Sequence, residues 1–540
     1  MVLLHSMDAL VAIPLGSIIL ALSAFLLARE ELKSCLLSSI SFPISIASKR
    51  VKAWRFLLDG PNIIQAGYDK AKGSPYEVLA PDARYVFVSS AEHIKEIDAA
   101  SDNVLSLQAA AKQMLQPKYT MNNFNWFDKR GVDGTPLVRT LRSLLTNNVP
   151  NLIPDIRAAV SKMFDTFHDS LPATNGAKAA PLYPMVKEAV AYSNALAFFG
   201  AELAQDKQFM KAAIDFIENT LLIAEILRLL PSSLVPIVGK LLARHFRSHD
   251  VLHSTLIPVT EERLRERALK RLGHKTPSHV SEKFLSSRCS PLLMADQKDC
   301  IQWVMECSPT QKPWSAERIV HELMALWFGS VHVLTTTICY AVHDICLHPE
   351  YVEPLRKELQ GPEWETFEKT GKGLPLLDSF IRESARLTPV ESMSTRRQAL
   401  QPFQLSDGTR IEIGECFCTP QRAMARDPAN FEKPLDFHGF RFVDPRVLSD
   451  LKQPGFNIPK TAKPSQLTDT SNSQLWGTGR MACPGRFYAA AVMKIILGLY
   501  LTKYDMELAD KKAPRWFTWR SFIYPSASTI VNLRPTGATE

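Results

Sequence analysis

Fifteen residues near the C-terminus, Trp476 to Ala490, constrain the possible folds of this chain more than any other segment. Their glycines permit turns and close backbone approaches that other residues cannot make. These glycines are Gly477, Gly479 and Gly485. Pro484 can open an Ala-rich apolar helix over 487–501, and the free N–H groups at its start favour a thiolate at Cys483. Alone, Cys-Pro-Gly is typical of a buried structural cysteine, but the whole segment is arranged to bind a soft or borderline metal.

Two charged segments lie upstream of this loop. A predicted helix from about Leu376 to Leu387 ends just before a proline, because proline disfavours helix at the residue that precedes it. This helix carries Glu383 and Arg386 three residues apart, hence on one face. The second segment, FEKPLDFHGFRF over 431–442, carries Arg441. Both segments place charge where the surrounding pattern predicts burial.

These segments, in this order, resemble the cytochrome P-450 superfamily. The loop that ends at Cys483 resembles the haem-binding sequence Phe-x-x-Gly-x-x-x-Cys-x-Gly, with Trp476 in place of phenylalanine and in the Ala-Cys-Pro-Gly-Arg-Phe form common among filamentous-fungal members. Glu383 and Arg386 match Glu-x-x-Arg, and Arg441 matches the arginine that completes a Glu-Arg-Arg network. The chain is identified as a membrane-anchored member of the filamentous-fungal, specialised-metabolism type, and the resemblance spans nearly the whole chain.

The resemblance implies a mainly α fold with small β-sheets (α+β) and haem b, iron protoporphyrin IX, with Cys483 as the axial thiolate on the metal. Such a ligand donates electron density to iron and favours cleavage of the O–O bond. Glu383, Arg386 and Arg441 are expected to form a structural network, because buried charges persist only when paired. The implied cofactor-binding residues are Cys483, Trp476, Gly477, Gly479, Arg480, Gly485 and Arg397.

Electron-transfer partners follow from the same resemblance. Electrons would come one at a time from NADPH through a membrane-bound NADPH-cytochrome reductase, with cytochrome b5 as an optional further partner. The acidic docking face of the reductase should meet basic residues on the thiolate side of the haem. The candidates are Arg480, Arg486 and Lys494, and ordinary surface charge or a propionate contact is the alternative for each.

A long helix is predicted to cross the core. Ser315 can cap it, and no Gly-Pro interruption follows before about Leu347 apart from Gly329. In the family this helix carries an acid or histidine followed by a threonine, which relay protons to bound oxygen. Here His332 takes the first position, but Val333 stands where the threonine is expected, and a valine cannot hold a water for protonation.

Three explanations of this departure stay open. Ser330 or Thr335 supplies the hydroxyl after a small register shift, a substrate hydroxyl or water supplies it, or the enzyme does not activate dioxygen in the usual way. The catalytic candidates are therefore His332, Ser330 and Thr335.

The chain departs from the family pattern a second time, at the residues expected to hold the haem propionates. Met481 stands two positions before the cysteine, where arginine or histidine commonly contacts a propionate, and the adjacent Arg480 would point elsewhere. Arg397 resembles the family arginine that reaches one propionate. Trp126-x-x-x-Arg130 resembles a third motif, although the glycines that follow predict a loop. The candidates for that third role are Arg130, Arg139 and Arg142.

A run of uncharged residues, Ala9 to Ala28, is about 30 Å long as a helix, which matches the hydrocarbon core of a bilayer. Basic residues follow the run, so the positive-inside rule places the rest of the chain in the cytoplasm. We expect a 1–34 anchor with one transmembrane helix in the endoplasmic reticulum membrane, a 35–55 linker and a 56–540 catalytic domain. A cleaved signal and a buried core helix are the alternatives.

Composition excludes several classes of protein. The chain is 46% hydrophobic with a formal net charge of +8, which argues against a disordered protein, and no dense basic run indicates nucleic-acid binding. Nine scattered cysteines, an odd number, argue against a disulfide framework. Periodicity predicts helices over 153–171, 187–199, 209–230 and 251–272, strands over 83–88 and 403–417 with a turn at Asp407-Gly408, and loops over 271–314, 361–375 and 443–475.

The substrate pocket expected by resemblance is apolar. Its lining comes from the long helix, the turn after Glu-x-x-Arg and the C-terminal hairpin, namely Leu326, Gly329, Val333, Val390, Met393 and Ile523. Such a pocket fits a hydrophobic small molecule, such as a terpenoid, polyketide or indole alkaloid intermediate. The expected activity is insertion of one oxygen atom from O2. A haem-thiolate isomerase or dehydratase that consumes no O2 is the alternative, because members of that type also lack the threonine, and a non-catalytic haem carrier is a third.

Overall fold

The computed structural model of the chain describes residues 44–537, apart from 133, 175–176, 273–298, 451–455, 457–462 and 472. The predicted anchor and its membrane span lie outside these described residues. The first described helix, α3 (Ile44–Ala71), begins inside the predicted linker and continues across the expected start of the domain. It bends at Asp59, where the backbone leaves the helical region shortly before Pro61.

Helices make up most of the described chain. Besides α3 they are α4 (Ala91–Ala99), α5 (Leu107–Leu115), α6 (Pro117–Thr120), α7 (Pro136–Arg139), the π-helical η1 (Thr140–Leu145), α8 (Thr146–Ser170), α9 (Leu182–Phe199), α10 (Ala201–Gln205), α11 (Lys207–Leu229), α12 (Val235–His245), α13 (Ser248–Arg271), α14 (Cys300–Cys307), α15 (Ala316–Leu347), α16 (Val352–Gln360), α17 (Pro362–Thr370), α18 (Pro375–Leu387), α19 (Gln421–Ala425), α20 (Pro445–Asp450) and α21 (Arg486–Lys503), with the short 3-10 helices η3 (Pro349–Tyr351) and η4 (Gly479–Met481).

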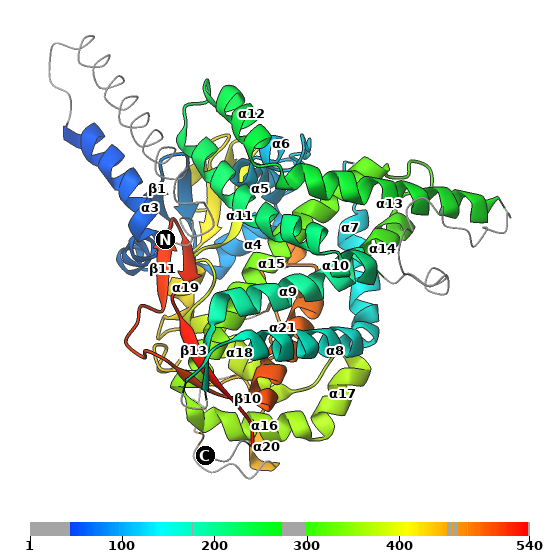
Figure 1. The fold of residues 1–540 in the computed structure, drawn as a ribbon. Helices are drawn as coiled ribbons and strands as arrows, with labels where there is room; N and C mark the ends of the chain where they lie inside the picture. Colours follow the sequence, from blue (N-terminus) through cyan, green and yellow to red (C-terminus); the bar gives the residue numbers. More distant parts are fainter. Residues whose placement is uncertain are drawn as a thin grey trace, which may run out of the picture.

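The core is built around α15, which has the predicted bounds. Ser315 caps it by accepting a hydrogen bond from the Arg318 N–H, and it ends before the His348-Pro349 pair, where proline disfavours helix. It packs against α9, α13, α18 and α21, and Figure 1 shows it in the middle of the molecule. In the described part of the chain it is the one helix long and apolar enough to cross a membrane, and most of its apolar stretch is buried inside the protein.

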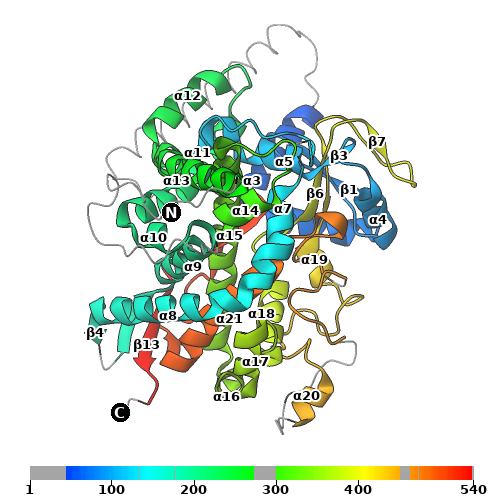
Figure 2. The ribbon, with the colours of Figure 1, turned by 90° about the vertical axis from the view of Figure 1, so that its right-hand side faces the viewer.

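Short strands form the remaining layers. A five-stranded sheet has the order β1 (Tyr76–Leu79), β2 (Arg84–Phe87), β9 (Cys416–Thr419), β6 (Ser394–Ala399) and β3 (Leu105–Ser106). A four-stranded sheet has the order β10 (Tyr504–Leu508), β13 (Ile530–Pro535), β5 (Ala177–Pro181) and β4 (Ala173–Thr174). Two hairpins pair β7 (Phe403–Gln404) with β8 (Arg410–Ile411) and β11 (Trp516–Trp519) with β12 (Phe522–Pro525). In Figure 2 the larger sheet lies beside α4 and α5, away from α8 and β4.

The predicted helices occur as α8, α9, α11 and α13, with ends close to the expected ones, but α8 begins seven residues and α9 five residues earlier than predicted. The predicted hairpin turns at Asp407-Gly408, between β7 and β8, but its last part is a separate strand, β9, that joins the five-stranded sheet. The three predicted loops are wrong in part, because each contains a helix. These helices are α14, α17 and α20, and α14 and α17 bury apolar side chains against α8, α9 and α15.

Candidate active site

Hydrogen bonds to backbone carbonyls fix the shape of the loop before α21. The Cys483 N–H donates to the Trp476 carbonyl at 2.7 Å, and the Trp476 indole N–H donates to the Leu467 carbonyl at 2.7 Å. Gly477 has φ +75° and Gly479 has φ +59°, conformations that side chains rarely adopt. A Cβ on Gly479 would lie 2.7 Å from the Asp98 carboxyl carbon. The glycines are thus required by backbone conformation and by the close approach of α4.

The Cys483 thiol stands at the start of α21, half-buried. Burial raises its pKa, and the Gly485 N–H and the Arg486 guanidinium act in the opposite direction. The expectation that the helix end alone favours a thiolate is therefore incomplete, because in the metal-free protein burial is the larger effect. A bound metal cation deprotonates a coordinating thiol outright, so the Cys483 sulfur would be a thiolate whenever a metal is bound.

One face of α15 is open although the helix is otherwise buried. Val333 is 41% exposed and Gly329, one turn earlier, is also exposed, whereas Val331 and Leu334 are buried. A Cβ added to Gly329 would meet no atom within 4 Å. Leu326 is half-buried and follows the same face at a three-residue step. We call this the open face of α15, because packing against neighbouring elements leaves it uncovered.

The three catalytic candidates take different positions around α15. The Ser330 hydroxyl borders the open face, donates to the Trp327 carbonyl at 3.1 Å and accepts from the Asn194 side-chain amide at 3.1 Å. Thr335 is fully buried, and its hydroxyl donates to the Val331 carbonyl at 2.8 Å. Residues two positions apart on a helix point about 200° apart, so Thr335 faces away from Val333. The geometry does not favour Thr335 as the relay hydroxyl, and that role stays a prediction.

His332 is buried beside the open face, not on it. Its ring lies 5.2 Å from the Tyr524 ring, centroid to centroid, and its Nε2 has no hydrogen-bond partner among the described residues. Burial lowers the pKa of His332 to about 4, with Lys187 adding a smaller effect in the same direction. The imidazole is therefore neutral at pH 7. Its role as a proton donor stays a prediction.

Three residues near this face were not predicted from the sequence. Thr336 lies within about 60° of Val333 around the helix, and its buried hydroxyl has no partner among the described residues. Asn194 of α9 joins Ser330 to α21, because its carbonyl oxygen accepts from the Tyr488 hydroxyl at 3.0 Å. Helical periodicity counted from Val333 could have found Thr336. The Asn194 and Tyr488 contacts join residues about 140 and 290 positions apart and carry no local signal.

A group of arginines surrounds the other side of the loop. Arg130 and Arg142 both donate to the Arg480 carbonyl, at 3.3 and 2.8 Å, and neither has a carboxylate partner among the described residues. The Arg480 side chain turns away, as expected, and pairs with Asp102 at 2.7 Å, so its prediction as a haem ligand is not favoured. Arg397 is buried, 3.6 Å from an Asp98 oxygen.

The positive charge of these arginines favours the binding of anions beside the loop. Burial lowers the pKa of Arg130, and the neighbouring Arg142 lowers it further. Burial also lowers the pKa of Arg397, against the attraction of Asp98. The Trp126 indole N–H is buried without a partner among the described residues. Arg139 and Arg142 are both exposed, but Arg130 and Arg142 donate to the Arg480 carbonyl of the loop, so the geometry favours these two.

The residues present fit a haem. A flat iron porphyrin with two propionates requires an open helix face, room beside the backbone such as that at Gly485, where an added Cβ would meet no atom within 4 Å, a cysteine sulfur and nearby cations. Of the three arginines, Arg130 and Arg142 have no carboxylate partner among the described residues, and Arg397 lies 3.6 Å from Asp98. Cys483 would be the iron ligand. Arg130, Arg142 and Arg397 would hold the propionates.

Behind the loop, a single buried carboxylate gathers two arginines. Glu383 has no exposed surface, and its oxygens accept from Arg386 at 2.8 and 2.9 Å and from Arg441 at 3.0 and 3.1 Å. The His438 N–H donates to the same carboxylate at 3.0 Å. Both arginines also donate to backbone carbonyls of 425–436. The trio thus ties α18 to the segment before the loop, and of its members only Arg386 reaches a cleft, which Ala385 and Phe431 also line.

Of the predicted pocket residues, Val390 and Ile523 lie side by side, whereas Met393 lies in another part of the core. The Ile523 N–H donates to the Val390 carbonyl at 2.9 Å, so the C-terminal hairpin and the turn after α18 lie side by side. Tyr340 of α15 donates to the Ile523 carbonyl at 3.0 Å. The Met393 side chain is buried in the core of the five-stranded sheet with Phe56 and Tyr85, and its role as a lining residue stays a prediction.

The predicted reductase-docking residues also need correction. Lys494 is buried and pairs with Asp378, and its ammonium group donates to the Gly373 carbonyl at 2.9 Å. It cannot meet a partner protein. Arg486 is half-buried and donates to the Cys483 and Thr468 carbonyls at 2.9 and 3.0 Å. Arg480 alone among the three is substantially exposed.

Comparisons with known proteins agree with this geometry. Residues 68–533 match the family model described as cytochrome P-450. The chain is 29% identical over 484 residues to cytochrome P-450 monooxygenase janP of Penicillium janthinellum, covering 88% of this chain and 85% of that protein. It is 26% identical to the monooxygenase paxP of Penicillium paxilli, with the same coverage. The retinoic acid bound structure of cyanobacterial CYP120A1 has the same fold, with a TM-score of 0.62 at 15% identity, covering 88% of this chain and 96% of that one.

Proposed function

The chain belongs to the cytochrome P-450 family and is a monooxygenase, and from this premise we propose that its substrate is a hydrophobic small molecule of the terpenoid, polyketide or indole alkaloid type. The open face of α15 carries this proposal. Leu326, Gly329 and Val333 offer the substrate carbon and hydrogen only, and Gly329 leaves room close to the helix. A pocket with this lining orients an apolar compound by shape and excludes water.

The haem and the residues of this chain have different parts in the proposed reaction. Haem, held by Cys483, supplies dioxygen activation and insertion of one oxygen atom, with electrons that come from NADPH through a reductase. The residues of this chain position the substrate, close the cavity and handle protons. Ile523 and Val390 fix the hairpin against the turn after α18, so the far wall of the pocket is held by backbone hydrogen bonds.

We propose Ser330 as the hydroxyl that replaces the missing threonine. It borders the open face one turn from Val333, and its Oγ is held between the Trp327 carbonyl and the Asn194 amide. Ser330→Ala should lower product formed per NADPH consumed, and Val333→Thr in the same chain should restore the coupling. Unchanged coupling in Ser330→Ala would assign proton delivery to a substrate hydroxyl or water. Product formed without O2 or NADPH would support the isomerase or dehydratase alternative.

The membrane and the electron donor complete the proposal. We infer a single-pass anchor in the endoplasmic reticulum with the domain in the cytoplasm, supported by the uncharged run over 9–28 and the basic residues after it. A cleft of about 640 Å³ beside Thr478 and Gly479 has Lys95 and Lys463 in its lining, and both are exposed. These two cations, with the exposed Arg480 next to Gly479 in the sequence, suit the acidic face of a reductase better than the buried Lys494. Charge reversal at Lys95 and Lys463 should slow reduction of the haem, while protein stability stays unchanged.

The test of the overall proposal is reconstitution. The full chain is combined in vesicles with NADPH-cytochrome reductase and a panel of apolar compounds, and substrate-induced change of the haem spectrum is measured first. A binding compound should then give an oxygenated product, with label from ¹⁸O₂ and with NADPH consumption that matches product. Tight binding of polar, charged compounds in preference to apolar ones would contradict the assignment of the pocket.

A further inference from the structure

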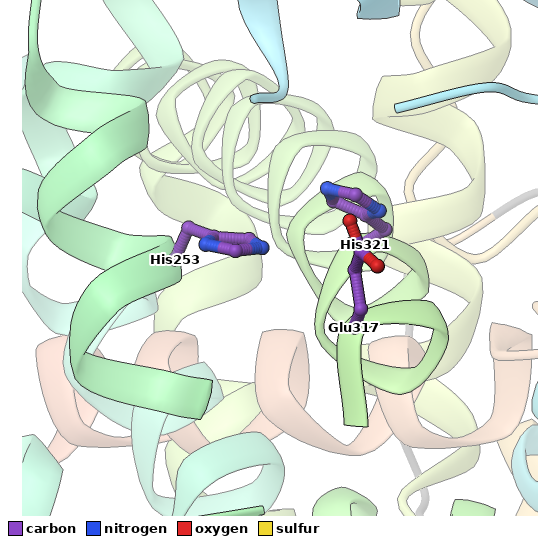
Figure 3. Close-up of side chains that lie close together, drawn as sticks. All are labelled: His253, Glu317 and His321. Carbon is purple, nitrogen blue, oxygen red and sulfur yellow. The ribbon is translucent and has the colours of Figure 1, made fainter. Parts of the chain in front are cut away.

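We propose that His253, Glu317 and His321 form a binding site for a divalent transition metal ion, for which zinc is the first candidate. The three side chains come from two helices, His253 from α13 and the other two from the first turns of α15. One ligand atom from each lies within 4.8 Å of the others. Figure 3 shows the His253 ring directed from α13 toward the pair on α15. No haem residue belongs to this cluster.

Helix geometry brings two of the three ligands together. Glu317 and His321 are four residues apart, so they share one face of α15. In a tetrahedral zinc site with bonds of about 2.0–2.1 Å, neighbouring ligand atoms are about 3.3 Å apart. The present spacing of up to 4.8 Å exceeds that value, and Glu317 is exposed, so its carboxylate has the freedom to approach the histidines.

His321 is already set up as a ligand. Its Nε2 lies 3.1 Å from the Asn122 carbonyl, which can only accept, so Nε2 carries the proton and Nδ1 keeps its lone pair. Metal-binding histidines commonly donate their second N–H to a backbone carbonyl in this way. Stacking against Phe124, with ring centroids 4.7 Å apart, and nearly complete burial fix the ring. The order of the imidazole therefore does not depend on the ion.

His253 supplies the independent observation. Its Nε2 is buried and has no hydrogen-bond partner among the described residues, and its ring lies 5.1 Å from that of His321. A buried polar nitrogen without a partner is costly, and a metal ion would satisfy it. The nearby cation Arg318 is engaged with Glu322 at 2.7 Å, so it leaves the Glu317 carboxylate to the ion.

The ligand set indicates which metal. Two imidazoles and one carboxylate suit zinc, with a fourth position for water, and copper(II) or nickel(II) bind such nitrogen donors as well. Magnesium and calcium require mainly oxygen ligands. The site lies about 12 Å along α15 from Gly329, at 1.5 Å per residue over eight residues. Three protein ligands leave the fourth position open, unlike the closed set of a purely structural zinc site. The effect that we assign to the ion is that it fastens α13 to the start of α15.

The experiment uses the haem-loaded full chain without a polyhistidine tag, stripped with a chelator. Zinc is titrated by competition with a chromophoric chelator, and thermal unfolding is followed with and without the ion. We expect one zinc per chain, a higher midpoint of unfolding with zinc and no response to magnesium or calcium. His253→Ala and Glu317→Gln, both outside the buried core, should weaken zinc binding at least tenfold and remove the thermal shift.

His245→Ala is the matched control, because His245 is an exposed histidine on α12 outside the cluster. It should bind zinc like the wild type. Failure of the wild type to bind stoichiometric zinc, or equal binding by His253→Ala, Glu317→Gln and the wild type, would overturn the proposal. X-ray absorption at the zinc edge should show two imidazoles in the wild type and fewer in His253→Ala.

Discussion

Glu383→Gln should be among the most damaging conservative substitutions in the chain. The amide keeps the size of the side chain but removes the one negative charge that Arg386 and Arg441 share in a site with no solvent exposure. Removing one partner of a buried ion pair costs about 3–5 kcal/mol. Both guanidinium groups keep their bonds to backbone carbonyls, so the loss is in charge pairing and stays within that range. Against a typical total of about 5–15 kcal/mol, this loss is at least about a fifth of the stability.

The assay is urea unfolding of the purified protein, followed by tryptophan fluorescence, together with haem content per chain. The folded-to-unfolded ratio should fall by a factor of about 150 to 5,000, since about 1.4 kcal/mol corresponds to tenfold. Asp215→Asn is the control, because it makes the same chemical change in an exposed pair with Lys211 and should cost well under about 1 kcal/mol. A Glu383→Gln protein with full haem and stability within about 1 kcal/mol of wild type would refute the structural role of the network.

Three further outcomes are expected. Cys483→Ala should abolish the strongly red-shifted carbon monoxide band of the reduced protein; a band that persists would remove the thiolate assignment. Val333→Thr should change the unfolding midpoint little, because the side chain is 41% exposed on the open face; a loss above about 2 kcal/mol would show that the face is closed. Burial lowers the pKa of His332 to about 4 and so favours the neutral imidazole in the folded protein. The contribution of His332 to the free energy of unfolding is therefore complete above the ordinary histidine pKa near 6.5 and is lost as the pH falls from there toward 4. His332→Gln should therefore be less sensitive to acid, by about 2 kcal/mol between pH 7 and pH 5, and identical pH curves of stability would contradict the shift.

The sequence predicts elements whose boundaries are local. Both ends of α15 follow from a capping serine and a nearby proline, and the structure has them at the predicted residues. By contrast, α17 was predicted as a loop, because its nine residues carry few apolar side chains and glycines flank it. Its contacts come from α8, where Arg157 lies over the Trp364 ring at 4.5 Å and approaches Glu368. Contacts between residues about 200 positions apart leave no periodic signal.

The same distinction applies to the site. The cysteine loop could be predicted because its glycines, proline and sulfur are contiguous. Lys494 was named as a docking candidate because it is a basic residue expected on the thiolate side of the haem, and only the fold shows that Asp378 of α18 lies opposite it. Thr335 was named through a small register shift of the motif, and Thr336 was not considered. The angular step of 100° per residue already places Thr336 nearer to Val333.

The hydrogen-bonded chain from Ser330 through Asn194 to Tyr488 has a consequence for how such enzymes diversify. It fastens three helices together at one point of α15, while Gly329 and Val333, on the adjoining face, make none of these side-chain bonds. Substitutions on the face that meets the substrate therefore leave the fastening intact. A library randomised at Leu326, Gly329 and Val333 should yield mostly folded proteins with altered substrate preference, so new specificities can be selected on an unchanged scaffold.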